Sequence, residues 1–204
     1  MKSSRWLLLS FAVMALAGSA LLPLRAQNEA IPAEVNALFD DVIDIDKLRV
    51  LNPLKLTGEQ IDKITAAIKT SQKDYDKALA DAAVPPIKEL AKDIKDVRKK
   101  MLAGAPIPKD FDDKVKGIQD AFVKKRDTAD YNSLKSLSEI VKKVFTDEQF
   151  KKAAEISRKF VEKDSTPNTK NTDDKFFNFY VMQIFIRYPR IVPLLEEMKK
   201  AKAE

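Results

Sequence analysis

The chain of 204 residues contains neither cysteine nor histidine. Without cysteine no disulfide can form, so the fold must be stabilised by its own apolar core. Without histidine the chain lacks the commonest metal ligand and the commonest general base at neutral pH. Zinc sites built from cysteine and histidine are therefore excluded, and so are serine–histidine and cysteine–histidine catalytic systems.

Glycine is also scarce, with only four in the whole chain. Folds rich in β-structure need glycine at many turns, and no segment alternates apolar and polar residues with the period of a strand. No glycine-rich phosphate loop occurs, and we find no pair of carboxylates whose spacing supports catalysis. We therefore predict an all-α binding protein, with no enzyme activity, no cofactor and no metal site.

The N-terminus has the pattern of a secretory signal peptide. Two basic residues precede an apolar run over residues 6–17, and small residues follow. Cleavage is expected after Ala20 or after Ala26, and we favour Ala26 because the chain turns polar there. An uncleaved membrane anchor is the alternative, since the longer apolar stretch just reaches spanning length. The sequence thus predicts a signal peptide over residues 1–26, export to the periplasm, and no stable membrane insertion after cleavage.

The charge of the mature chain is modest. The formal net charge of +6 falls to +3 without the three basic residues of the leader. Nucleic-acid binding domains have a stronger basic footprint than this. Together with the export signal, this charge argues against nucleic acid as a partner.

Beyond the leader, apolar residues recur at intervals of three and four, which is helical periodicity. We expect a single all-helical domain over residues 27–204, made of long antiparallel helices that form hairpins in a cradle or bundle. Prolines and glycines set the expected boundaries. One helix should run from Thr57 to Val84, before two prolines, and the next from Pro86 to Gly104.

In two segments the apolar pattern does not follow one continuous helical face. One apolar helical face near the start consists of Val35, Leu38, Phe39 and Val42. The acidic residues that follow from Asp44 are expected to interrupt that helix; they lack the glycine and glutamate of an EF-hand loop, so we interpret them as a helix end rather than a calcium site. A later segment has two apolar sets, Phe111, Val115, Ile118 and Phe122, then Leu134, Leu137, Val141 and Val144, rotated by ~140° from each other. Either one long helix changes its buried face or the segment bends.

Two hexapeptides repeat one helix-start pattern, LTGEQI at residues 56–61 and FTDEQF at residues 145–150. In each, threonine at the N-cap should accept a bond from the third residue's N–H, and glutamine at that third position should reach back to the cap N–H. A hydrophobic staple would join Leu56 to Ile61 and Phe145 to Phe150. In the second helix Phe150, Ala153, Ala154 and Phe160 are expected to point inward. One such box is common, whereas two with the same glutamine and staple are more specific.

The longer stretches LKLTGEQIDKI and KVFTDEQFKKA resemble the LTXXQ motifs of the Spy/CpxP-like periplasmic proteins. The matching positions are Leu56, Thr57, Gln60, Thr146 and Gln149, with Phe145 in place of leucine. The resemblance covers roughly residues 50–160. It implies a cradle-shaped antiparallel homodimer that acts as an ATP-independent chaperone for unfolded or partly folded envelope proteins. The alternative it implies is an envelope-stress module that binds the periplasmic domain of a membrane sensor. Metal-binding relatives use histidine, which this chain lacks.

A stripe of lysines is the candidate client-binding surface, formed by Lys88, Lys92, Lys95 and Lys99 at helical spacing. Between residues 85 and 126 there are twelve lysines and arginines against seven acids, a net charge of +5. An ordinary solvated face, balanced by neighbouring acids, is one interpretation. The other is a basic surface that attracts acidic clients by long-range charge.

The C-terminal extension over residues 173–204 has no counterpart in the family and carries an aromatic-rich helix. The stretch KFFNFYVMQIFIRYP holds six of the sixteen aromatic residues. A helix that is apolar almost all round is buried or lies in an interface. We expect this one to pack into the core of the monomer, with a dimer contact or a client groove as the alternative.

Overall fold

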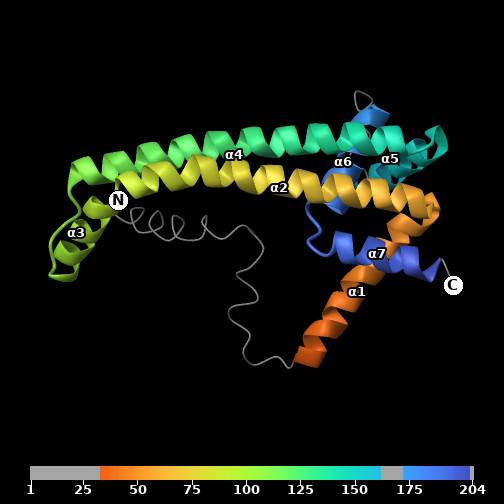
Figure 1. The fold of residues 1–204 in the computed structure, drawn as a ribbon, viewed down its shortest axis with the longest axis horizontal. Helices are drawn as coiled ribbons and strands as arrows, with labels where there is room; N and C mark the ends of the chain where they lie inside the picture. The colour runs from red at the N-terminus through yellow and green to blue at the C-terminus, as the bar shows by residue number, and fades with distance from the viewer. Residues whose placement is uncertain (1–32, 162–171, 203–204) are drawn as a thin grey trace. The chain divides into compact units, whose positions relative to one another are not determined.

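A computed structural model describes residues 33–161 and 172–202 (Figure 1). The expected signal peptide and most of the polar segment before the aromatic tail lie outside these residues. The described part of the chain is helical and contains no strand, which confirms the all-α fold. None of its helices is long and apolar enough to cross a membrane.

The helices and their connecting turns follow one another along the chain as α1 (Ala33–Leu51), the 3₁₀ turn η2 (Asn52–Leu54), α2 (Gly58–Glu89), α3 (Ala91–Leu102), α4 (Lys109–Val144), α5 (Asp147–Val161), α6 (Asp173–Val181), the π-helical segment η3 (Met182–Ile186) and α7 (Ile191–Ala201). Their contacts divide the described residues into two compact units. Unit 1 comprises residues 74–130, and unit 2 comprises the remaining described residues on either side of it. Helices α2 and α4 contribute residues to both units.

The main apolar core lies in unit 2, and the aromatic tail supplies much of it. Five of its six aromatic side chains are buried, namely Phe176, Phe177, Tyr180, Phe185 and Tyr188, whereas Phe179 is 38% exposed. The hydroxyl of Tyr180 donates a hydrogen bond of 3.0 Å to the carbonyl of Val50, which satisfies the one polar atom that its burial removes from water. Burial also raises the pKa of Tyr180. The expected packing of the tail into the monomer core is therefore confirmed.

The prediction that acidic residues end the first helix was wrong. It continues without interruption from Ala33 to Leu51. Asp44 lies within it and is only 7% exposed. Its carboxylate accepts hydrogen bonds from Tyr188 and Arg190, which follow it by more than 140 residues. Partners so distant are invisible to local sequence patterns, and they compensate a charge that would otherwise disfavour this helix.

Helix α2 corrects the expected end at Val84, because it runs through Pro85 and Pro86 to Glu89. The break comes at Leu90, whose N–H still bonds to the carbonyl of Pro86 at 3.2 Å. A proline removes a helical hydrogen bond but has a backbone φ that suits a helix. The helix therefore ends about one turn beyond Val84, the residue that precedes the two prolines.

The end of α3 matches the expectation for Gly104. This glycine has a φ of 88°, in the left-handed region that glycine adopts without strain. Its N–H bonds to the carbonyl of Met101 at 3.0 Å, and the N–H of Ala105 bonds to the carbonyl of Lys100 at 3.1 Å. This pair of bonds is a Schellman motif, which satisfies carbonyls that the helix end leaves free.

Helix α4 resolves the alternative left open for its segment, because it is one α-helix of 36 residues. The first apolar set belongs to unit 1 and is half-buried, whereas in the second set Leu137 and Val141 are fully buried in unit 2.

One expectation for α5 was wrong, because Phe160 is 65% exposed. The buried face of α5 instead continues through Ser157 to the half-buried Val161.

Candidate functional site

Both expected capping boxes are present at the starts of α2 and α5. The N–H of Thr57 donates to Gln60 Oε1 at 3.0 Å, and the N–H of Gln60 donates to Thr57 Oγ1 at 3.2 Å. The corresponding bonds between Thr146 and Gln149 are 2.9 and 3.2 Å. Each box satisfies two backbone N–H groups that the first turn of a helix leaves without partners.

The two boxes, 89 residues apart in sequence, also meet through their glutamine side chains. Gln60 Nε2 donates to Gln149 Oε1 at 2.8 Å, and Gln149 Nε2 donates to Gln60 Oε1 at 3.1 Å. The second N–H of each amide reaches a backbone carbonyl at 2.8 Å, that of Val144 from Gln60 and that of Leu54 from Gln149. With the bond from its own cap, each amide uses both donors and both acceptor positions. We call this arrangement the glutamine pair.

The glutamine pair explains a residue choice that local reasoning cannot. A capping box accepts glutamate or glutamine at its third position, because only a side-chain oxygen is needed. A carboxylate has no N–H, so it could not donate to the carbonyls of Leu54 and Val144. The occurrence of glutamine rather than glutamate in both boxes was therefore the sequence feature that pointed to this pair. Helix capping alone does not explain it.

The apolar residues beside the two boxes lie in the core. Leu56 and Ile61 are buried, and so is Phe145. The rings of Phe145 and Phe150 both contact Phe177 of α6, with centroids 5.8 and 4.9 Å apart from it. The aromatic tail thus packs directly against the second motif. All polar atoms of the two glutamine amides have partners, so these amides position the helices and offer no free group to a ligand.

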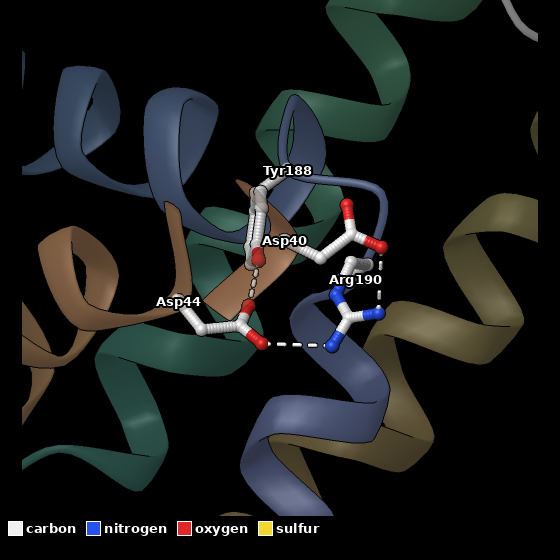
Figure 2. Close-up of polar contacts among 4 residues, drawn as sticks. All are labelled: Asp40, Asp44, Tyr188 and Arg190. Carbon is white, nitrogen blue, oxygen red and sulfur yellow. Dashed lines mark hydrogen bonds and ion pairs between the residues drawn. The ribbon is translucent and has the colours of Figure 1, made fainter. Parts of the chain in front are cut away.

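A second polar cluster joins α1 to the tail (Figure 2). The hydroxyl of Tyr188 donates to Asp44 Oδ1, and Arg190 donates to Asp44 Oδ2 at 2.8 Å and to Asp40 Oδ2 at 3.1 Å. The bond to Asp44 raises the pKa of Arg190, which keeps the guanidinium charged. The ammonium of Lys47 lies 5.3 Å from the centre of the Tyr188 ring. Asp40 and Asp44 of α1 thus pair with Arg190, and no group of metal ligands occurs among the described residues.

The opposite side of α1 is apolar and exposed. Its six large apolar residues, which we call the α1 apolar face, are Val35, Leu38, Phe39, Val42, Ile43 and Ile45, and each is between 37% and 63% exposed. Four of them are the helical face expected from sequence. Scattered exposed apolar side chains are normal on protein surfaces, but a contiguous set of this kind marks an interaction site.

The predicted lysine stripe is divided between two helices of unit 1. Lys88 belongs to α2, whereas Lys92, Lys95 and Lys99 belong to α3, beyond the break at Leu90. All four are exposed, and none forms an ion pair with another described residue. Asp93, one of the acids beside these lysines, forms an ion pair with Lys114 of α4, whose Nζ lies 3.5 Å from Asp93 Oδ2. The three lysines of α3 therefore form an open basic surface.

No protein-family profile matches this sequence, and neither a curated protein nor a solved structure shows significant similarity to it.

Proposed function

We propose that this protein is an exported, ATP-independent chaperone of the LTXXQ type, which holds partly folded envelope proteins on exposed helix faces. The observation that carries the proposal is the α1 apolar face. A soluble helix normally turns such residues inward, whereas α1 buries Asp44 against the half-exposed Arg190 and leaves six large apolar side chains exposed to water. Non-native proteins expose apolar surface of the same kind, so the two would associate by the hydrophobic effect.

Charged groups would set how clients approach and leave. The rim of the α1 apolar face carries exposed acids at Glu34 and Asp41, whereas the open lysines of α3 provide the opposite sign in unit 1. Long-range attraction raises the rate of encounter without fixing one bound geometry. Binding through partly exposed apolar contacts is reversible, so release needs no nucleotide.

The experiment is suppression of aggregation. The mature chain, residues 27–204, is added at stoichiometric ratio and without nucleotide to a chemically denatured client, and light scattering is followed after dilution. We expect suppression by the wild type and its loss in the triple variant Leu38→Ser, Phe39→Ser, Val42→Ser. All three side chains are exposed, so the variant should fold. Leu102→Ser removes an apolar side chain of unit 1 that is even more exposed, at 73%, and is the control.

Two results would count against the proposal. If the wild type leaves aggregation unchanged, the chaperone function is wrong. If the triple variant suppresses aggregation as well as the wild type does, clients bind elsewhere.

The second candidate is an envelope-stress module that binds the periplasmic domain of a sensor. The open lysines of α3 favour it, because they could meet an acidic surface on such a domain. The double variant Lys92→Glu, Lys95→Glu should then lose binding to the periplasmic domains of the host's envelope sensors, measured by surface plasmon resonance. Unchanged binding would exclude these lysines from the contact.

A further inference from the structure

Four residues of the α1 apolar face form a stripe with the spacing of a coiled-coil seam. They follow one another at intervals of three, four and three residues, and each is between 37% and 63% exposed: Val35, Leu38, Val42 and Ile45. Apolar residues at alternating intervals of three and four are the pattern by which one helix packs along another. The stripe is ~15 Å long, which matches about three turns of a partner helix.

Two acids flank this stripe at the positions that select coiled-coil partners. Glu34 and Asp41 each precede a valine of the stripe and stand seven residues apart, so they lie on the same edge of it. Both are exposed, and neither forms an ion pair with another described residue. Charges at these flanking positions decide which helices can pair with each other.

The other charges of α1 are balanced by neighbours. Asp46 and Arg49 form an ion pair at 2.8 Å. Asp40 and Asp44 lie 3.1 and 2.8 Å from the guanidinium of Arg190, and the single lysine of α1 supplies a second positive charge beside them. The two acids that flank the stripe therefore remain as the net charge of this surface.

These acids disfavour a second copy of α1 as the partner. If two α1 helices packed antiparallel along the stripe, the edges that carry Glu34 and Asp41 would lie against each other. If they packed parallel, Asp41 of one copy would face Asp46 of the other. Like charges placed opposite each other select against a partner, whereas lysine or arginine at the facing positions would be attracted.

We propose that the α1 apolar face binds a cationic amphipathic helix, which has an apolar seam of its own with lysine or arginine beside it. The inference rests on the proposed function, because it takes the same face as the client-binding surface and names the class of client. Apolar contact along the two seams supplies the attraction, and the flanking acids select the sign of the partner's charge. An acidic helix with the same seam would be repelled, and a basic segment without a seam would lack the apolar contact.

Two synthetic helical peptides of about three heptads test the proposal. Both carry valine and leucine at the seam positions, and one has lysine where the other has glutamate at the flanking positions, so that neither pairs with itself. Each peptide carries a fluorophore and is titrated with the mature chain, residues 27–204, while fluorescence anisotropy is followed. At low ionic strength we expect the lysine peptide to bind about tenfold more tightly than the glutamate peptide, and this ratio should fall as salt is added.

The double variant Glu34→Lys, Asp41→Lys should reverse this preference, so that the glutamate peptide binds more tightly. Both acids are exposed and lie outside the ion pairs of Asp44, so the variant should fold, which circular dichroism checks. Asp76→Lys, Asp120→Lys is the matched control, because it changes the net charge equally at two exposed positions of unit 1. That variant should keep the preference of the wild type.

Four outcomes would overturn the inference. The first two are equal affinity of the wild type for both peptides and a preference for lysine that survives in Glu34→Lys, Asp41→Lys. The third is a dimer of the mature chain that dissociates in the triple variant Leu38→Ser, Phe39→Ser, Val42→Ser, because a second copy would then cover the face. The fourth is binding to vesicles of phosphatidylcholine and phosphatidylglycerol that the same triple variant loses, because the face would then belong to a lipid surface.

The aggregation experiment separates this inference from the chaperone function. Suppression that is lost in the triple variant, without a preference between the peptides, would contradict the class of client and leave the chaperone function in place. A preference for the lysine peptide without suppression of aggregation would contradict the chaperone function and leave the binding site in place.

Discussion

The two units bury their side chains to very different degrees. Every residue of the main apolar core belongs to unit 2, where aromatic rings and aliphatic residues from α1, α2, α4, α5, α6, η3 and α7 pack together. Among the described residues of unit 1, only three apolar residues are buried, namely Leu90, Val97 and Ala129. Since stability follows buried apolar area, unit 2 should hold the fold together while unit 1 opens at lower free energy. The same helices, α2 and α4, therefore have a rigid part and a compliant part.

The largest test of this contrast is a pair of cavity-creating substitutions. Phe185→Ala empties a fully buried site in unit 2 and should lower the free energy of unfolding by roughly 3–5 kcal/mol. Phe122→Ala removes the same ring from a half-buried site in unit 1 and should cost about 1 kcal/mol. Urea unfolding followed by circular dichroism measures both. Equal losses would mean that unit 1 contributes a core of comparable strength.

The glutamine pair provides the next test. Gln60→Glu and Gln149→Glu keep the capping oxygen but remove the N–H groups that reach Val144 and Leu54. They also place a carboxylate against an amide oxygen, so each should cost about 2 kcal/mol. The double variant should depart from additivity, because the two side chains contact each other.

Gln119→Glu in unit 1 is the matched control for the glutamine pair. Gln119 makes no hydrogen bond to another described side chain, so its substitution should change stability by less than about 0.5 kcal/mol. If all three single variants changed the free energy of unfolding by the same amount, the pairing of Gln60 with Gln149 would not contribute to stability.

Two tyrosines give a smaller contrast. Tyr180→Phe in unit 2 leaves the buried carbonyl of Val50 without its donor and should cost about 1–2 kcal/mol. In unit 1, burial together with a bond to Asp130 raises the pKa of Tyr75 to about 12. Its hydroxyl is nearer to solvent, so Tyr75→Phe should cost about 0.5 kcal/mol or less. A larger loss from Tyr75→Phe in thermal unfolding would reverse the ranking of the units.

The smallest expected effect is a pH dependence from the surface of unit 2. Lys159 and Lys152 lower the pKa of Glu155 from 4.5 to about 2. A carboxyl whose pKa is lower in the folded state stabilises the fold above its unfolded pKa, and that contribution is lost as the pH falls from about 4.5 to about 2. Glu155→Gln should flatten this part of a plot of unfolding free energy against pH. An unchanged acid slope would show that water screens these ion pairs completely.

The parts of the structure that depend on neighbours in sequence were predicted. The two capping boxes and the left-handed stop at Gly104 follow from a few adjacent residues, and the burial of the aromatic tail follows from its composition. The features that were missed need partners far along the chain. Asp44 remains in a helix because of Tyr188 and Arg190, whereas α2 continues through Pro85 and Pro86, whose fixed φ is compatible with a helix.

The candidate surfaces divide in the same way. The spacing of apolar residues on α1 identifies a helical face, but only the fold shows that it points to water. The lysines were found by spacing, and the helix break that separates Lys88 from the others was not.

The glutamine pair also constrains how the gene for this protein could change in length. It ties together the points where the chain enters α2 and α5, so the intervening residues begin and end at positions that are fixed within unit 2. Whole helical turns could be inserted or deleted together in the unit 1 parts of α2 and α4. Both ends of the intervening residues would then keep their positions in unit 2. Unit 1 can therefore lengthen or shorten during evolution, or by design, while the core and its two helix starts remain the same.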